Sequence, residues 1–169
     1  MNSNSTSTAA RFAAAYAVLT AAHEVGDYIV QRDDDAAAKG KPGREGTAAC
    51  RRHVVSYTAT QAVALFAADR CLGLGLNWRR AAAGLALSAV THYAIDRCAT
   101  HWPDDSDGAP LLVRAAHAAG KGTWLTRDPG AGALLDQALH KGWIGVAAAI
   151  AAGRRTPDAP LTSPDAVRT

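Results

Sequence analysis

The stretch AAAGLALSAVTHYAID, residues 81–96, decides the fold class, because alanine and leucine make up half of it. Alanine has the highest intrinsic helix propensity, and the chain of 169 residues contains 40 alanines, close to a quarter of its length. Strand-forming residues are sparse and scattered along the rest of the sequence. The composition therefore predicts an all-α protein and argues against a β-sandwich or a barrel.

Three other apolar stretches predict long helices, at residues 9–32, 47–75 and 131–152. Asn77 suits the N-cap of a further helix, which contains the opening stretch and runs to residue 98, because its side chain can accept backbone hydrogen bonds. Residues 100–130 form a long connection, in which 111–119 could form a short amphipathic helix. Four main helices of this length favour packing as a bundle.

A single domain is expected over residues 9–152, with disordered tails at 1–8 and 153–169. Lysine and arginine number 18 against 15 acidic residues, and this net charge of +3 is too balanced to imply nucleic-acid binding. Three cysteines without a CxxC pattern fit a reducing compartment and cannot build a cysteine zinc site.

The apolar stretches also raise the question of a membrane. Several approach the roughly 20 residues that a transmembrane helix needs. Each nevertheless contains charged or titratable groups, and a charge in the middle of a span costs about 2.5–3.5 kcal/mol. The sequence leaves two states open: helices embedded in or bound to a membrane, or a water-soluble cytoplasmic bundle with an alanine-rich core. Either state is compatible with a homo-oligomer.

A four-residue spacing between polar side chains recurs on every predicted long helix. His23 precedes Asp27, His53 precedes Tyr57, His92 precedes Asp96, and Asp136 precedes His140, each by four residues. Residues four apart lie on one face of an α-helix, one turn above the other. In a bundle the inward faces of the helices converge on one core volume. The spacing therefore predicts a shared polar site in the core.

Neutral histidine and ionised aspartate are good ligands for zinc, manganese or iron. A buried carboxylate is costly unless it is paired or binds a metal. We therefore expect a divalent metal, zinc first, with ligands drawn from His23, Asp27, His53, His92, Asp96, Asp136 and His140. Gln31, Tyr57 and Gln137 are expected to orient the ligands or the substrate.

A divalent ion held in this way would activate water and polarise a phosphoryl oxygen. The pattern predicts a metal-dependent hydrolase acting on a phosphoester, which could be a small molecule or a lipid. Asp27 and Asp96 are the catalytic candidates, because an aspartate that is not a ligand can take the proton. The competing interpretation is a non-enzymatic membrane or partner-binding protein, whose buried His–Asp hydrogen bonds only fix helix register. A weaker third interpretation is ion conduction by an oligomer.

Several segments resemble the DUF3307 family of small bacterial proteins. Residues 22–31, AHEVGDYIVQ, followed by Lys39, are similar to that family's opening AH-x-x-GD-[FY]-x-x-Q motif. HYAID at residues 92–96 is similar to its later H-x-x-x-D helix, LDQALH at 135–140 to its closing DQ-x-x-H helix, and His53 to a further histidine early in its second helix. The resemblance covers about residues 12–150. It implies a helical protein embedded in the bacterial inner membrane, and it implies no particular activity.

Overall fold

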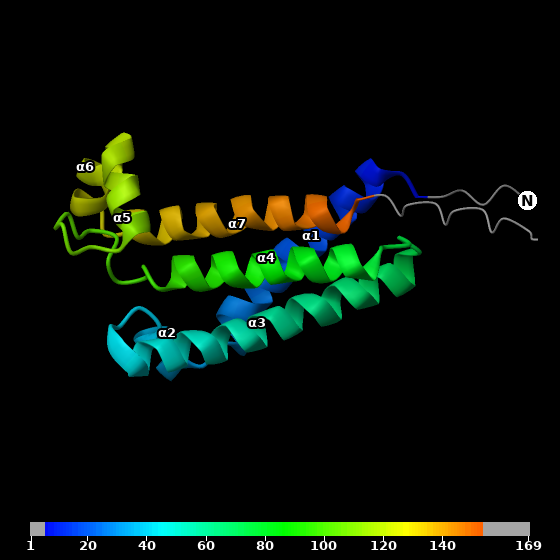
Figure 1. Ribbon diagram of the computed structural model, residues 1–169, viewed down its shortest axis with the longest axis horizontal. Coiled ribbons are helices and arrows are strands. Elements are labelled where there is room, and N and C mark those ends of the chain that lie inside the picture. Colours follow the sequence, from blue (N-terminus) through cyan, green and yellow to red (C-terminus); the bar gives the residue numbers. More distant parts are fainter. Residues whose placement is uncertain (1–5, 154–169) are drawn as a thin grey trace, which may run out of the picture.

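The computed structural model describes residues 6–153, and within them the chain is all-helical, as the composition predicts. The four long helices are α1 (Thr8–Val25), α3 (Gly43–Leu72), α4 (Trp78–Asp96) and α7 (Ala131–Ala151). Helix α1 packs against α3 and α7, and α4 packs against the same two helices. Figure 1 shows α3, α4 and α7 running side by side, with α1 behind them. The expected tails lie almost wholly outside the described residues.

Five short elements complete the fold. After α1 the chain makes a π-helical turn, η1 (Gly26–Val30), and then the short helix α2 (Asp33–Ala38), which packs on α3. The long connection before α7 contains α5 (Leu111–Ala116), the π-helical turn η2 (His117–Lys121) and α6 (Gly122–Arg127). These last three elements gather at one end of the long helices (Figure 1).

Local signals in the sequence explain where the long helices begin and end. The Asn77 side chain accepts hydrogen bonds from the backbone N–H groups of Arg79 and Arg80, which confirms the predicted N-cap of α4. Ser7 caps α1 in the same manner, so that helix begins at Thr8. Helix α3 ends at Gly73, whose φ of +62° is the left-handed conformation that glycine adopts without strain.

Helices α4 and α7 approach each other closely because Gly84 lacks a side chain. A Cβ atom at this position would lie 2.5 Å from the Ala147 carbonyl oxygen, closer than real Cβ contacts allow. Buried alanines on α7, including Ala147, Ala148 and Ala151, continue this thin interface. The high alanine content therefore has a packing role as well as a helix-forming one.

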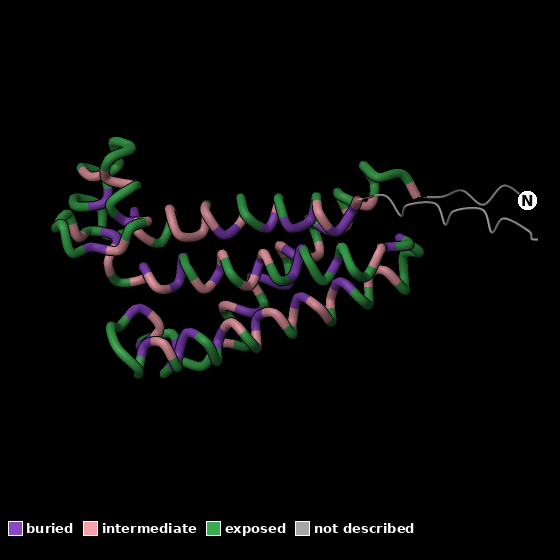
Figure 2. Tube along the Cα trace, in the orientation of Figure 1, coloured by how far each residue is buried: buried purple, intermediate pink, exposed green. Residues whose placement is uncertain are grey.

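Two apolar clusters fill the core at opposite ends of the long helices. One is centred on Leu19, Leu65, Leu85 and Ile144, and the other, beneath α5 and α6, contains Ile95, Trp102, Val113 and Leu125. Along α4 and α7 the predicted site residues fall between these clusters in the sequence. Figure 2 shows the buried positions recurring along the long helices. The core thus consists of a polar layer between two apolar ones.

The structure departs from the expected elements in three places. The first long helix does not continue in α form to residue 32, because η1 interrupts it at Gly26. Residues 33–38, which lie between the first two predicted helices, form α2, and α3 begins at Gly43 rather than near 47. None of the helices in residues 6–153 is both long enough and apolar enough to cross a bilayer, so the membrane spans considered above are not found there.

Candidate metal centre

All seven predicted ligand residues meet in the polar layer of the core. His23 and Asp27 come from α1 and η1, His53 from α3, His92 and Asp96 from α4, and Asp136 and His140 from α7. The four histidines and Asp96 are at most 2% exposed. The spacing of four residues within each helix therefore predicted the convergence correctly.

The most regular donor set is formed by His53, His92 and Asp96. The two Nε2 atoms lie 2.8 Å apart, and Asp96 Oδ2 lies 3.3 Å from that of His53 and 3.2 Å from that of His92. Ligands of a tetrahedral ion with bonds of about 2.0–2.1 Å stand about 3.3 Å from one another. The three atoms therefore form one triangular face of such a site.

Asp27, which lies in η1, faces the same pair of imidazoles. Its Oδ1 atom lies 3.4 Å from His53 Nε2 and 3.6 Å from His92 Nε2. The π-helical turn that carries Asp27 begins at Gly26, where a Cβ atom would lie 3.1 Å from the ring of Tyr57. A glycine here lets the end of α1 approach α3, and π-turns of this kind frequently occur at functional sites.

A second donor set shares Asp96 with the first. Asp96, Asp136 and His140 each offer one possible ligand atom, and these three atoms lie within 4.8 Å of one another. His23, Asp27 and His92 form a third set that meets the same condition. His140 Nε2 lies 3.6 Å from Asp96 Oδ1 and 3.2 Å from Asp136 Oδ2. Asp96 therefore points one carboxylate oxygen towards each of two neighbouring donor sets.

Lys39 also contributes to the polar layer, although the spacing of the polar residues does not predict it. It follows α2, and its Nζ atom lies 2.9 Å from Asp96 Oδ1 as an ion pair. Its side chain is 13% exposed. Burial would lower the pKa of Lys39, but the attraction of Asp96 and of the nearby Asp27 outweighs it and raises the pKa, which keeps the ammonium charged.

Burial and the neighbouring charges set the protonation of the first donor set. Burial lowers the pKa of His92 to about 4, despite the opposing influence of Asp96. For Asp96, burial acts to raise the pKa, but contacts with His140 and His92 and the charge of Lys39 together hold it well below its usual value. A neutral imidazole and an ionised carboxylate are the forms in which these groups bind metals.

The second donor set behaves differently. Burial acts to lower the pKa of His140, but contacts with Asp136 and Asp96 outweigh it and raise the pKa to about 9. His140 is therefore the imidazole that carries a proton at neutral pH in the metal-free chain. In contrast, burial lowers the pKa of His23, with the charge of His140 acting in the same direction and Asp27 opposing it.

The three residues predicted to orient the ligands, Gln31, Tyr57 and Gln137, differ in their contacts with the site. Gln137 Oε1 accepts a hydrogen bond from His23 Nε2–H at 3.1 Å. Tyr57 contacts the site through its ring, which stacks on His92, while its hydroxyl pairs with Ser88. The Nε2 atom of Gln31 is buried and has no hydrogen-bond partner among the described residues.

A chain of buried hydrogen bonds extends from Tyr57 along the core. Its hydroxyl lies 2.9 Å from Ser88 Oγ, which donates to Gln61 Oε1 at 2.9 Å. The Gln61 amide in turn donates to the Leu19 carbonyl oxygen. Gln61 lies four residues after Tyr57, and Ser88 four residues before His92, so the same spacing rule would have found both.

Several buried polar atoms in this layer lack well-aligned hydrogen bonds within residues 6–153. They are His23 Nδ1, Asp27 Oδ1, His53 Nδ1, His92 Nδ1, both carboxylate oxygens of Asp96, Asp136 Oδ1 and His140 Nε2. Buried polar groups in proteins are nearly always satisfied, so such a concentration needs an explanation. These buried His and Asp groups could hold a metal ion. At His53 and His92 such an ion would use the unpaired Asp96 Oδ2 and Asp27 Oδ1 atoms and would replace the hydrogen bond between the two Nε2 atoms.

Other candidate chemical groups lie outside the polar layer. His101 and His117 contact the backbone carbonyl oxygens of Gly40 and Trp102, so both fix loops. Burial raises the pKa of the Cys50 thiol to about 12 and that of Cys98 to about 11, which disfavours the reactive thiolate.

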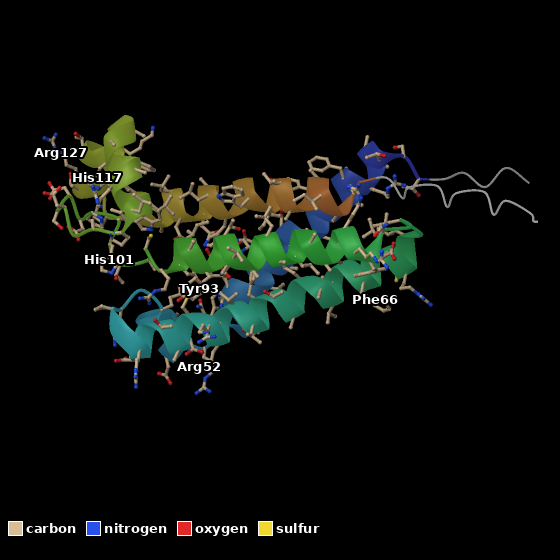
Figure 3. The ribbon with its side chains drawn as sticks, viewed as in Figure 1. Arg52, Phe66, Tyr93, His101, His117 and Arg127 are labelled. Atoms are coloured by element: carbon tan, nitrogen blue, oxygen red, sulfur yellow. The ribbon has the colours of Figure 1, made fainter. Side chains whose placement is uncertain are left out.

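A surface pocket of about 480 Å³ borders the polar layer at Asp136. It lies between α6, α7 and residues 99–103, and Asp136 forms part of its wall. Arg127 and Thr126 of α6 and Trp102 also line it. Figure 3 shows Arg127 and His101 at the same end of the molecule. Asp136 therefore belongs both to a donor set and to a solvent-connected pocket.

Comparison of the chain with models of protein families, with curated proteins and with solved structures finds no match.

Proposed function

We propose that the protein is a metal-dependent hydrolase that cleaves a phosphoester at the polar layer. The observation that carries this proposal is the triangle of His53, His92 and Asp96, whose donor atoms are 2.8–3.3 Å apart. Catalytic metal sites keep three protein ligands and leave a position open, and this set matches that pattern. Zinc suits two imidazoles and one carboxylate best, and manganese or iron would accept the same ligands.

The pocket beside Asp136 supports an anionic substrate. Arg127, an exposed residue, is among those that line the pocket, and a guanidinium matches the geometry and charge of a phosphate. Asp136 connects that pocket to the donor sets, and its side chain is 16% exposed. A phosphoester bound with its phosphate towards Arg127 would lie within the same solvent-connected space as Asp136.

The roles of the remaining residues follow from their contacts. When bound, a divalent ion would polarise the phosphoryl oxygen and promote the ionisation of water. Asp27, ionised and facing both imidazoles, is placed to take a proton from the attacking water. Gln137 would hold the ring of His23 through its contact with Nε2. Stacking by Tyr57 would fix the ring orientation of His92.

One observation favours a second candidate function without catalysis. The Lys39 ammonium already lies against Asp96, so the buried layer carries a cation of its own. A buried charge network can set the register of packed helices without binding a metal. In that case the polar layer would be structural, and the protein would act by binding a partner through its surface.

Activity and metal content together test the proposal. The purified chain would be stripped with a chelator, reloaded with Zn²⁺ or Mn²⁺ alone, and assayed with aryl phosphomonoesters, aryl phosphodiesters and phospholipid vesicles. The proposal expects metal-dependent cleavage of at least one substrate, reduced by at least about 100-fold in His92→Ala. Glu45→Gln, an exposed position, is the control and should retain the activity of the parent chain. Metal binding without hydrolysis of any of the three would overturn the enzymatic proposal, and absence of metal binding would favour the structural one.

A further inference from the structure

The two donor sets that share Asp96 resemble the layout of a dinuclear centre. Asp96 Oδ2 contacts His53 and His92, and Asp96 Oδ1 points towards His140. In two-metal sites a carboxylate commonly bridges ions about 3.5–4 Å apart. The arrangement of the histidines and aspartates alone would therefore accommodate two cations.

Lys39 changes that interpretation, because its charged group lies on the second set. Its Nζ atom is 2.9 Å from Asp96 Oδ1, the oxygen that His140 also faces. Asp27 and Asp136 are the other carboxylates that act on the ammonium. The lysine reaches this position from the turn after α2, and its side chain is largely buried.

We propose that the Lys39 ammonium takes the place of a second cation in this centre, so that the protein binds one divalent ion at His53, His92 and Asp96. The inference rests on the metal site of the proposed function, and it adds the stoichiometry and the position of the ion. It also assigns Lys39 the part of a positioning residue, which acts by holding Asp96 Oδ1 and leaving Oδ2 for the ion.

The charges of the layer support a single ion. Asp27, Asp96 and Asp136 supply three negative charges, and Lys39 supplies one positive charge. With His140 protonated and the other three imidazoles neutral, the layer is left with one negative charge, which a single divalent ion is sufficient to compensate. Two divalent ions would leave an excess of three positive charges in a buried volume, against one for a single ion, and uncompensated buried charge is strongly unfavourable.

The distances indicate which set holds the ion. The first set closes a triangle with sides of 2.8, 3.2 and 3.3 Å, close to the spacing of tetrahedral ligands. In the second set the His140 to Asp96 side is 3.6 Å, and the Asp96 oxygen is already occupied by Lys39. Asp96 Oδ2, the carboxylate oxygen that Lys39 leaves free, therefore lies on the side of His53 and His92.

The test is the number of ions per chain. Wild-type protein, Lys39→Met and Lys39→Arg would be equilibrated by dialysis against excess Zn²⁺ or Mn²⁺ and analysed for metal. We expect one ion in the wild type and in Lys39→Arg, which keeps the charge, and a second ion in Lys39→Met. Two ions in the wild type, or one in a folded Lys39→Met, would overturn the inference and leave the proposed hydrolase intact. One ion in the wild type without hydrolysis of any substrate would support the one-ion inference and overturn the hydrolase proposal. No ion in the wild type would overturn both.

A second pair of variants decides the question if Lys39→Met does not fold. His92→Ala removes a ligand of the expected ion, whereas His140→Ala removes a residue of the set that Lys39 occupies. We expect His92→Ala to lose the ion, with a fall in affinity of at least about 100-fold, and His140→Ala to retain it. Loss of the ion in a folded His140→Ala would overturn the assignment. Circular dichroism would establish that each variant is folded.

Discussion

The ring of Tyr57 stacks on the ring of His92, with centroids 3.8 Å apart and planes inclined by 23°. The Tyr57 hydroxyl points away from the donor atoms and pairs with Ser88. The ring and the hydroxyl therefore have separate contacts, the ring with the candidate metal centre and the hydroxyl with the core. This separation can be tested by substitutions that remove one and keep the other.

Tyr57→Phe should leave metal binding unchanged while lowering stability. The phenyl ring preserves the stacking on His92, and the loss of one buried hydrogen bond costs about 1 kcal/mol. Tyr57→Leu removes the stacking as well, so it should weaken metal binding in addition to stability. Urea unfolding and metal titration would measure the two effects. A Tyr57→Phe variant that loses its metal would show that the hydroxyl acts on the site after all.

Chelation should lower the melting temperature of the metal-loaded protein. A ligand present at 1,000 times its dissociation constant stabilises the folded state by about 4 kcal/mol. In a chain of this size each kcal/mol corresponds to about 2–4 °C, so we expect a fall on the order of 10 °C. Calorimetry with and without chelator measures it, and His53→Ala is the matched control because its melting should not respond to chelator. An unchanged melting temperature in the wild type would favour the structural interpretation.

Metal-free protein should lose stability as the pH rises above neutral. The pKa of His140 is about 9 in the folded chain against 6.5 for an ordinary histidine. Its contribution is therefore fully present below about pH 6.5 and is lost between about pH 6.5 and pH 9, where only the folded state keeps the proton. Urea midpoints across this range would show the decline. The decline should be much smaller in His140→Gln, and an equal decline in that variant would assign it to another group.

The same protein should also lose stability on acidification. Burial lowers the pKa of His92 to about 4, so the unfolded chain binds a proton that the folded chain does not as the pH falls from 6.5 towards 4. This contribution is present above about pH 6.5 and is lost below it. The metal-free protein should therefore be most stable near pH 6.5 with respect to these two histidines. Urea midpoints that rise continuously from about pH 6.5 to about pH 4.5 would contradict the burial of a neutral His92.

Lys39 and Asp96 should be strongly coupled in a double-mutant cycle on the metal-free protein. Removing one partner of a buried pair leaves an uncompensated charge and costs about 3–5 kcal/mol. The double variant Lys39→Met with Asp96→Asn should therefore cost less than the two single variants together, with a coupling of more than about 1 kcal/mol. The exposed pair of Lys41 and Glu45, with atoms 3.0 Å apart, is the control and should show less than about 1 kcal/mol. Equal coupling in the two pairs would contradict the burial of the Lys39 contact.

Gly84→Ala should destabilise the fold even though alanine is the better helix former. The added methyl would lie 2.5 Å from the Ala147 carbonyl oxygen, so α4 and α7 would have to separate, at a cost of about 1–3 kcal/mol. Gly142→Ala is the matched control, because among the described residues nothing lies within 4 Å of a methyl group there. That substitution should stabilise α7 by about 0.5–1 kcal/mol. Equal effects of the two substitutions in urea unfolding would contradict the close approach.

The sequence predicted the helices and the convergence of the polar residues because both follow from local periodicity. Positions four apart share a face, and that face turns inward wherever the flanking residues are apolar. The same periodicity predicts that His23, His92 and His140 lie together. Extending the rule by one more turn would have added Gln61 and Ser88.

Other features of the site could not be predicted because they depend on tertiary contacts. Lys39 lies in a turn between helices, where a lysine is normally solvated, and only packing against α4 buries it. The π-helical turn at Gly26 arises where η1 packs against Tyr57 on α3, a contact between residues 31 positions apart in the sequence. Distances between helices also decide which three of the seven candidate ligands form a triangle, and the periodicity of the sequence does not specify those distances.

The two apolar clusters at the ends of the long helices have no residue in common within the described chain. Truncating Leu65 in one and Val113 in the other should thus give free-energy losses that add to within about 0.5 kcal/mol, as for distant independent sites. The halves of the molecule can accordingly tolerate change separately. Sequence drift in the cluster beneath α5 and α6 would leave the far end unaffected, and the histidine layer would be the boundary between two regions free to diverge at different rates.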